Sequence, residues 1–576
     1  MTSLAHAVNA AHTLGSTLTE HAGTAGHAAQ SAAHSAAQPL AHLAANAPAH
    51  LAPAHLAAGP VGDLGNLVQS VDWLAIAPPV ITALVGLIVL VADLFMPDRR
   101  KPLLGWIATG GLALAGLSLL PLLDGDRSTF CLNSDAAVCS YTADHFTLAV
   151  QFLVLGGAFL TALLSIDIVE HTKLPAGEYW FLLLSSAAGA ALLPASRDLA
   201  TLVVALEVAS LPAFALVGLK RGDRRSSEAA LKFFLSSVAA TAVMLLGVSF
   251  VYAATGSMHL SRVAEGLEHV PGQLGTLATA GVALTLVGFA FKTAAVPFHF
   301  WVPDTYVGAP LPIAAYLSVV GKAVGFTGLI LVTVLAFPSY ADVWGPALAV
   351  LAALTMTLGN AAALRQRPER AHSAVRLLAW SSVGQAGYLL VPIAAAGYAS
   401  DPSHAIGSTV AYALMYAAVN LGAFAVAALV GRTNAANRLS DYRGLYATRP
   451  LAALALGFFL LCLAGLPPGI IGLFAKVTVF SAAVDAGLGW LAAVMAVNVV
   501  IALYYYLQWT ALLFRAPEPA AEPASAGAEG AGPSTAAPRL RIPAPLAAAI
   551  GLAAVLGIAL SGAPQLVLRF AAGTLL

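Results

Sequence analysis

Long apolar runs follow one another along this chain from about residue 70, and short polar segments separate them. Each run is close to the roughly 20 residues that a helix needs to cross the hydrocarbon layer of a bilayer. The pattern predicts an all-α polytopic membrane protein with about fourteen transmembrane helices. The predicted helices lie near 73–96, 102–123, 146–167, 178–196, 198–219, 229–254, 276–301, 309–336, 342–363, 373–397, 405–430, 451–483, 487–514 and 543–563.

Proline interrupts two of these runs close to a lysine. In LVGFAFKTAAVPFHFWVPD, Pro297 follows Lys292 by five residues, and in LCLAGLPPGIIGLFAKVTVF, Pro467 and Pro468 precede Lys476. Proline removes a backbone hydrogen bond and clashes with the preceding turn, so we expect both helices to be kinked or broken. Broken helices inside a membrane are tolerated chiefly where they are buried in protein or line a hydrated cavity.

Two interrupted segments in corresponding halves of a chain are typical of an inverted-repeat transporter fold. We therefore predict two inverted five-helix repeats with discontinuous helices, at 178–336 and 342–514. Three helices within 73–167 precede the repeats, and a last helix at 543–563 follows them.

Two segments lack the apolar pattern. Residues 1–65 are rich in alanine and contain eight histidines but no lysine or arginine, so they do not read as a signal peptide. Their loose histidine spacing favours a disordered or weakly helical extension over the alternative, a metal site. Residues 515–542 are rich in proline, alanine, glycine and glutamate without periodicity, which predicts a flexible linker.

Composition supports the membrane assignment, because 59% of the residues are hydrophobic and only 9% are charged. An ordinary soluble domain carries about 25% charged residues. Lysine and arginine together number 27, as do aspartate and glutamate, so the net charge gives no indication of a nucleic-acid partner. The lipid bilayer is the partner that this composition predicts.

The positions of the basic residues predict the topology. With the N-terminus outside, the loops and linker that fall inside hold 19 of the 27 basic residues, and the outside segments hold only Arg127, Arg197, Arg262 and Arg569. The positive-inside rule therefore places both termini on the extracytoplasmic side of a bacterial cell membrane.

Three cysteines occur in the chain. Cys462 lies in an apolar run and is expected to pack as a small hydrophobic residue. Cys131 and Cys139 share the polar loop TFCLNSDAAVCSY, which the topology places outside, where a disulfide between them could persist. Two unpaired thiols remain the alternative, and neither interpretation gives these cysteines a catalytic role.

The four remaining basic residues are lysines inside apolar runs, and Glu207 accompanies them. A charged side chain at the centre of a bilayer costs roughly 2.5–3.5 kcal/mol on insertion scales, so such residues usually mark ion or proton pathways. Placing Glu207 beside a lysine would favour the charged form of both groups, and a change in their separation would alter that balance. The alternative for Glu207 is a carboxylate that ties helices together.

The lysines differ in their sequence context. Lys292 and Lys476 lie beside the proline breaks, and Lys322, on the helix that follows Lys292, is placed to connect the two sites. Lys232 lies nearer the cytoplasmic end of its helix, where its side chain could instead reach the interface. His299 follows Pro297 at the first break and can both donate and accept a proton. Other polar groups in the helices, such as Tyr388, Tyr412, Tyr416, Ser381, Ser382, Gln385 and Asn420, are more often contacts between helices.

These residues occur within motifs that resemble a known family. The stretches LEVASLPAFALVG, SSEAALKFFLSS, FKTAAVPFHFWVPDTYVGAP, RLLAWSSVGQAGY, LSDYRGLYATRP, LPPGIIGLFAKVTVF and ALYYYLQ are similar to the antiporter-like membrane subunits of bacterial respiratory complex I, the NADH-quinone oxidoreductase. The lysine at position 476 and the absence of a long lateral helix after the last span match the subunit N type. The resemblance covers roughly residues 73–563.

The resemblance implies roles for individual residues. Glu207 and Lys292 match the glutamate–lysine pair of the first half-channel, Lys322 the connecting lysine and Lys476 the lysine of the second half-channel. Lys232 also falls where this subunit type has a lysine. The implied partners are the other membrane-arm subunits, which together with the rest of the complex would bind NADH, FMN, iron–sulfur clusters and quinone.

The resemblance implies a proton-translocating subunit that takes part in NADH:quinone oxidoreduction without a cofactor or metal of its own. The chain has no dinucleotide-binding GxGxxG after a strand and no cysteine cluster for an iron–sulfur centre. A subunit of a multisubunit cation/proton antiporter and a passive scaffold of the membrane arm remain the alternatives. The alanine, glycine and valine bias is associated with GC-rich bacteria that use menaquinone.

Overall fold

A computed structural model describes residues 71–133, 135–516 and 542–572 of the protein. The predicted extension at 1–65 lies outside the described residues, as does the predicted linker at 515–542 apart from its first two residues and its last. In the described part, the chain is almost entirely helical, with one short β-hairpin.

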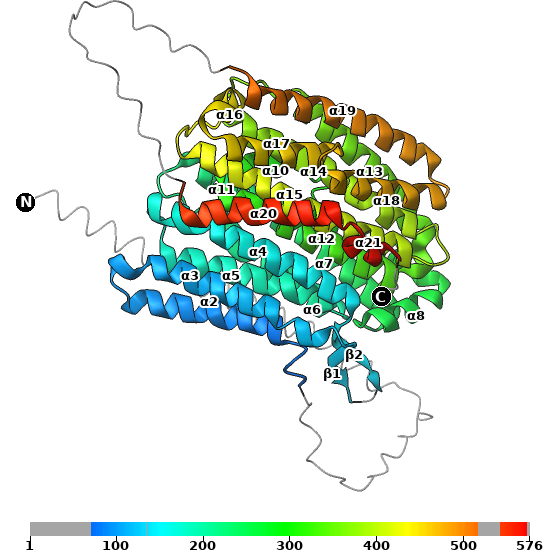
Figure 1. Ribbon diagram of the computed structural model, residues 1–576. Coiled ribbons are helices and arrows are strands. Elements are labelled where there is room, and N and C mark those ends of the chain that lie inside the picture. Colours follow the sequence, from blue (N-terminus) through cyan, green and yellow to red (C-terminus); the bar gives the residue numbers. More distant parts are fainter. Residues whose placement is uncertain (1–70, 134, 517–541, 573–576) are drawn as a thin grey trace, which may run out of the picture. The chain divides into compact units, whose positions relative to one another are not determined.

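The elements that follow are numbered along the chain (Figure 1). The helices are α2 (Ala77–Phe95), α3 (Pro102–Leu117), α4 (His145–His171), α5 (Ala176–Leu192), α6 (Leu199–Val217), α7 (Arg224–Thr255), α8 (Leu260–Glu268), α9 (Gly275–Thr293), α10 (Val302–Gly308), α11 (Leu311–Tyr316), α12 (Lys322–Ile330), α13 (Ala341–Leu364), α14 (Ser373–Ala396), α15 (Ser403–Gly431), α16 (Leu445–Thr448), α17 (Pro450–Ala464), α18 (Ile470–Asp485), α19 (Gly489–Phe514), α20 (Ala544–Gly562) and α21 (Gln565–Ala572). The strands are β1 (Arg127–Leu132) and β2 (Asp135–Ala143).

Thirteen helical segments within the described ranges are long and apolar enough to cross a membrane. They coincide with thirteen of the fourteen predicted segments. The remaining segment, 451–483, forms the two shorter helices α17 and α18, and the Pro467–Pro468 peptide, which is cis, lies between them. The all-helical polytopic fold and the second helix break are therefore confirmed.

The first break lies beside Lys292 as predicted, but the helix before it ends earlier than predicted. The sequence suggested a helix through residue 301, but α9 ends at Thr293, where the next residue, Ala294, adopts a left-handed conformation with φ 66°. The peptide between Val296 and Pro297 is cis, and the chain turns before it enters α10. The prediction was wrong about this end because the left-handed turn at an alanine has no signal in the apolar pattern.

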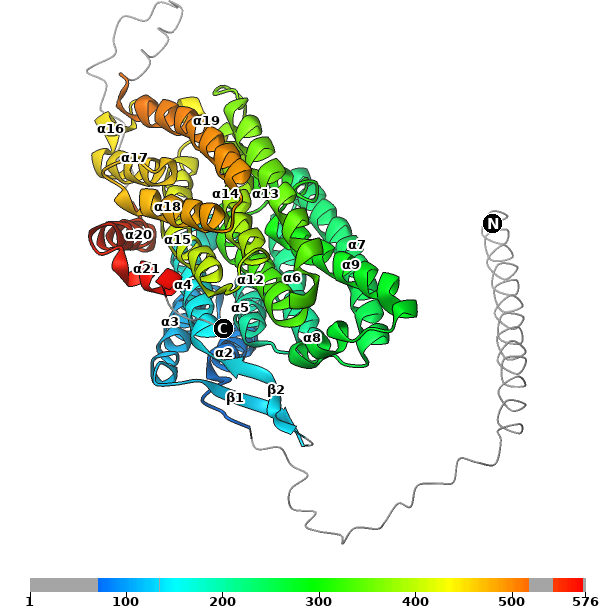
Figure 2. The same ribbon diagram turned by 90° about the vertical axis from the view of Figure 1, so that its right-hand side faces the viewer.

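The most buried helices occupy the middle of the bundle. α12, α14 and α15 lie at its centre, with α2 and α3 at one edge and α19 at the opposite edge (Figures 1 and 2). The outer helices carry exposed large apolar side chains such as Phe95, Val500 and Val555. Exposed apolar side chains on the outer helices fit a lipid-facing surface, because lipid tails solvate them as well as a protein core does.

The polar loops gather at the two ends of the bundle as the topology predicts. Four contacts join loops and helix ends on the side predicted to be cytoplasmic: Arg225 Nη1 lies 2.6 Å from His372 Nε2, Arg432 forms an ion pair with Asp167, Ser440 Oγ donates to Glu369 at 3.1 Å, and Arg443 Nε donates to the Ala516 carbonyl at 2.8 Å. At the opposite end, Arg262 of α8 forms an ion pair with Asp135 of the hairpin at 2.5 Å.

The hairpin is fixed to the helix ends beside it. β1 and β2 pair antiparallel, and a disulfide joins Cys131 to Cys139, which face each other across the pair. The hydroxyl of Tyr141 on β2 donates to the Ala75 carbonyl at 3.0 Å. Burial raises the pKa of Tyr141 to about 12, so this hydroxyl keeps its proton as a donor.

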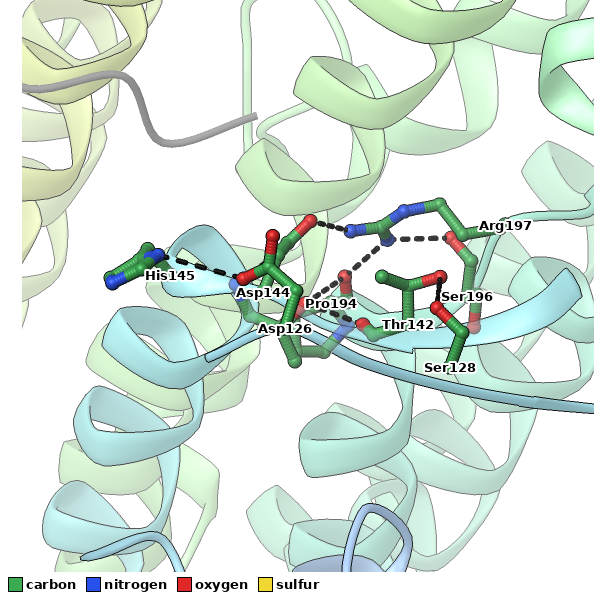
Figure 3. A network of polar contacts seen from close by, with 9 residues as sticks. Asp126, Ser128, Thr142, Asp144, His145, Pro194, Ser196 and Arg197 are labelled. Atoms are coloured by element: carbon green, nitrogen blue, oxygen red, sulfur yellow. Dashed lines mark hydrogen bonds and ion pairs between the residues drawn. The ribbon is translucent and has the colours of Figure 1, made fainter. Parts of the chain in front are cut away.

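An arginine connects the base of the hairpin to two helices (Figure 3). Arg197, just before α6, forms an ion pair with Asp144 and donates to the carbonyls of Pro194 at 2.8 Å and Ser196 at 3.1 Å. Asp144 in turn caps α4 by accepting a bond from the Thr147 N–H at 2.8 Å. This network fixes the start of α4 relative to the start of α6.

Close approach between α7 and α9 provides a test of the packing. A Cβ atom at Gly247 of α7 would lie 2.4 Å from the Thr285 backbone nitrogen of α9, whereas a Cβ at Gly110 of α3 would meet nothing within 4 Å. We expect Gly247→Ala to cost about 1–3 kcal/mol by overpacking and to lower the thermal midpoint of the detergent-solubilised protein, measured by size-exclusion chromatography after heating. Gly110→Ala is the matched control, and equal midpoints for the two variants would contradict the packing described here.

Candidate functional site

Lys292 is buried at the end of α9, with 5% of its surface exposed. Its ammonium group donates to two hydroxyls, Ser210 Oγ on α6 and Ser237 Oγ on α7, both at 2.7 Å. The ring of Phe214 lies 5.1 Å from Nζ, within the range of a cation–π contact. The lysine is therefore held by neutral groups from two other helices.

Glu207 lies one helical turn before Ser210 on α6, so the two residues share a face of that helix. Its Oε1 accepts a bond from Thr241 Oγ1 of α7 at 2.8 Å. The ion pairs among the described residues do not include Glu207 with Lys292. The predicted pair thus lies on two helices, α6 and α9, that both pack against α7, and each charged group is bonded to hydroxyl groups.

A small cavity lies beside Lys292. Its volume is about 20 Å³, which is enough for about one water molecule. Ser186, whose Oγ lies 2.9 Å from the hydroxyl of Tyr316, lines the cavity, and so does Gly321 in the turn that precedes Lys322. The cavity therefore leads from the first lysine toward the second.

Lys322 begins α12 directly after a π-helical turn at Leu317–Gly321, and only 1% of its surface is exposed. Its ammonium group donates to the backbone carbonyl of Ser382 on α14. The Ser382 hydroxyl lies 2.9 Å from the hydroxyl of Tyr416 on α15. Lys322 therefore contacts the polar groups of α14 and α15 through one serine.

Lys476 is held by the end of a broken helix. α17 ends at Ala464 because Gly465 adopts a left-handed conformation with φ 85°, which leaves the last carbonyls of the helix without partners. The Lys476 ammonium donates to the carbonyls of Leu463 at 2.9 Å and Ala464 at 2.6 Å. A cation is stabilised there because the C-terminal end of a helix carries partial negative charge.

A second small cavity joins Lys476 to the polar groups near Lys322. It measures about 20 Å³ and is lined by Lys476, Gln385, Tyr412 and Tyr416. Tyr416 therefore both contacts Ser382, the partner of Lys322, and lines the Lys476 cavity. One cavity of the size of a water molecule thus lies beside Lys292 and reaches Gly321, the neighbour of Lys322, and another lies beside Lys476 and reaches Tyr416, which bonds to the Ser382 hydroxyl.

Sequence reasoning missed several polar partners. Tyr506 on α19 bonds to Ser381 and, at 3.3 Å, to Gln385, while Tyr505 donates to Asn360 at 3.0 Å. Ser210, Ser237 and Thr241, which satisfy Lys292 and Glu207, were also missed. Single hydroxyls in apolar helices give no signal that separates these residues from helix contacts, although the run YYY at 504–506 is unusual for a membrane helix.

Two predicted supporting residues lie apart from this chain of lysines. Lys232 has 49% of its side chain exposed and pairs with Glu228 at 2.8 Å and with Asp304 of α10 at 2.9 Å, as expected for a lysine that reaches the interface. His299 lies in the turn between α9 and α10, with its ring 5.5 Å from that of Trp380. Within the described residues, the Nδ1 atom of His299 is buried without a hydrogen-bond partner.

The arrangement can exchange protons. A carboxylate within hydrogen-bond distance would fix a buried lysine in its ammonium form, but the three buried lysines bond to hydroxyls and carbonyls instead. Hydroxyl groups and water can both donate and accept a proton. At Lys292, whose partners are hydroxyl groups, an approaching charge could therefore change the protonation of the lysine.

Two broken helices, each with a buried lysine, and a third buried lysine between them define an antiporter-like membrane subunit. A family model described as NADH:quinone oxidoreductase/Mrp antiporter matches residues 196–502. The chain belongs to this family of membrane subunits, and the resemblance noted in its motifs is confirmed.

Individual relatives give the same result. NADH-quinone oxidoreductase subunit N 2 of Streptomyces griseus is 77% identical over 514 residues, which cover 89% of this chain and 96% of that protein. A chain of respiratory complex I from Thermus thermophilus with bound aureothin has a TM-score of 0.67 at 32% identity, covering 86% of this chain and all of that one. A chain of the Mrp complex from a Dietzia species has a TM-score of 0.71 at 22% identity, covering 87% of this chain and 96% of that one, and shares the fold.

The partners of Lys292 can be tested by a double-mutant cycle. We expect Ser237→Ala to lower the thermal stability of the purified protein, because an interhelical bond of this kind contributes about 0.6–1.7 kcal/mol. The loss should shrink when Lys292→Met is present as well, since the neutral side chain needs no acceptor. Ser249→Ala on the same helix is the control, because Ser249 bonds only to the Leu245 carbonyl of its own helix. Additive effects of the two changes would count against the described contact.

Proposed function

We propose that this chain is the subunit N of a bacterial NADH-quinone oxidoreductase and that it translocates protons while the complex passes electrons from NADH to quinone. The identity of 77% to a subunit N over nearly the whole of that protein supports the assignment. The observation that carries the proton function is the buried series Lys292, Lys322 and Lys476, in which no lysine bonds to a carboxylate among the described residues.

In this proposal, Glu207 controls the protonation of Lys292. A charge that arrives from the neighbouring subunit would release Glu207 from Thr241 and draw it toward Lys292, which bonds to Ser210 one helical turn along α6 from Glu207. The approach of the carboxylate favours the ammonium form of Lys292, and its withdrawal favours proton release. The released proton would pass through the first cavity to Lys322, then through Ser382 and Tyr416 to Lys476.

The redox chemistry is proposed to take place in other subunits. NADH, FMN, iron–sulfur clusters and quinone would be bound there, and this chain would hold no redox centre and no metal. It would act in the lipid bilayer together with the other membrane-arm subunits. The energy released by the redox chemistry would reach Glu207 as a change in electric field, because an electric field can act on a charged side chain that binds no cofactor.

We also propose that helices 178–336 and 342–514 form the two inverted repeats. In each unit the fourth of five membrane helices is the broken one, α9 followed by α10 in the first and α17 followed by α18 in the second. Each break lies beside a buried lysine, Lys292 or Lys476. The helices within 73–167 and the helix at 543–563 would frame the two units.

A cation/proton antiporter subunit is the second candidate, because the Mrp chain shares this fold. That likeness has 22% identity and concerns the fold alone, whereas the likeness to subunit N is 77%. The first candidate is therefore favoured.

The proton function can be tested in the intact complex. We expect Glu207→Gln and Lys292→Met to leave assembly intact and to reduce proton translocation per NADH oxidised several-fold, because the charge that controls the path is lost. Proton uptake by proteoliposomes or inverted vesicles, together with native gels for assembly, provides the measurement. Glu268→Gln, at an exposed position on α8, serves as the matched control. Normal pumping by an assembled Lys292 variant would instead support the passive scaffold.

The proposed orientation, with both termini extracytoplasmic, can be tested by cysteine labelling. Ser400 and Arg370 are exposed residues in loops predicted to lie outside and inside, respectively. In intact cells, a membrane-impermeant maleimide should label Ser400→Cys, whereas Arg370→Cys should react only after permeabilisation. The opposite pattern would reverse the topology.

A further inference from the structure

A cavity of about 530 Å³ lies between four helix ends on the predicted cytoplasmic side, away from the lysine series. The end of α2, the start of α3, the end of α4 and the start of α5 meet there, and these helices lie side by side (Figures 1 and 2). Five of its twelve lining residues are charged and seven are apolar. We propose that this cavity binds the head group and upper acyl chain of an anionic phospholipid.

The charged side of the cavity offers cations for a phosphate. Arg99, Lys101 and Lys173 line it. Lys101 is already occupied by Asp93 at 3.4 Å and Asp98 at 3.5 Å. Arg99 and Lys173 form no ion pair within the described part of the chain. Basic pockets between membrane helices on the cytoplasmic side are suited to anionic lipid head groups.

Two carboxylates on the lining oppose this charge, and one of them, Asp98, already pairs with Lys101. Glu170 lies near the end of α4 and is exposed, without an ion-pair partner among the described residues. It would repel a phosphate, so its removal should strengthen binding. This gives the proposal a variant with an effect opposite to that of the cations.

The apolar side of the cavity fits hydrocarbon. Ile166, Val169, Leu174 and Trp180 form it, and each is buried within the protein. A soluble anion would contact only the cations, whereas a phospholipid also has hydrocarbon to place against the apolar side. The two-sided lining therefore favours a lipid over free phosphate.

Neighbouring residues place the cavity at the level of the bilayer surface. Trp106, one turn into α3, is 51% exposed, and tryptophans gather at the boundary between lipid and water. Leu94 and Phe95 at the end of α2 are 78% and 82% exposed. Large apolar side chains this exposed are expected to face lipid, so the mouth of the cavity is within reach of the membrane.

The proposal can be tested with the purified, delipidated complex. A phosphatidylglycerol probe with a photoreactive group near its head group should crosslink to peptides that contain 98–102 and 166–180, and a phosphatidylcholine probe should label them much less. Arg99→Gln combined with Lys173→Gln should reduce the phosphatidylglycerol labelling by about thirtyfold, since each cation near a membrane surface contributes about a fivefold factor.

Three further variants separate the site from general attraction to charge. Arg100→Gln removes one positive charge, against two in the double variant, from an exposed neighbour outside the cavity. It should change labelling by less than about fivefold. Glu170→Gln should increase labelling, and Ala176→Phe should reduce it by filling the cavity without a change of charge. Circular dichroism and assembly of the complex would confirm that each variant is folded.

Two kinds of result would overturn the proposal. Equal labelling by phosphatidylcholine, or an Arg100→Gln loss as large as that of the double variant, would leave only non-specific attraction. Displacement of the probe by inorganic phosphate would identify a site for a small anion instead of a lipid. Neither result bears on proton translocation, which depends on different residues.

Discussion

A buried ammonium group needs acceptors, and the rest of this structure is arranged around that requirement. In a bilayer core, water is scarce and an unsatisfied charge is costly, so each buried lysine must find oxygen atoms within the protein. Lys292 takes them from serines of two helices, Lys322 from a backbone carbonyl, and Lys476 from the open end of α17. Close packing of α6, α7 and α14 brings these oxygens to Lys292 and Lys322, and the broken helix α17 brings them to Lys476.

Lys292 and Lys476 are stabilised by different kinds of hydrogen-bond acceptor. The serine hydroxyls at Lys292 can rotate, and each can donate as well as accept, so this site can respond to the movement of a side chain. The carbonyls at Lys476 only accept, and they belong to the helix backbone, so their positions change only if α17 or α18 moves. An electrostatic signal would thus act on side chains in the first repeat and on helices in the second.

The sequence was sufficient for the helices and the lysines but not for their partners. Apolar runs and prolines determine where a chain can span a bilayer and where a helix must break, and both signals are local. Ser210, Ser237 and the carbonyl of Leu463 become acceptors only through the packing of distant segments, and the same residue types occur throughout helix contacts. The separation of Glu207 from Lys292 was not predictable either, because it depends on packing. Lys292 bonds to Ser210, which lies one turn along α6 from Glu207, and not to Glu207 itself.

The π-helical turn before Lys322 also changes which face of the helix the following side chains occupy. A π-turn holds one residue more than an α-turn, so every residue after Leu317–Gly321 is rotated by about 100° relative to an unbroken α-helix. Lys322 is the first residue after this turn, and its ammonium group bonds to the Ser382 carbonyl. A helical-wheel diagram of this segment would therefore assign the lysine to the wrong face, and loss of a single residue from the turn would swing it out of the polar series without changing the lysine itself.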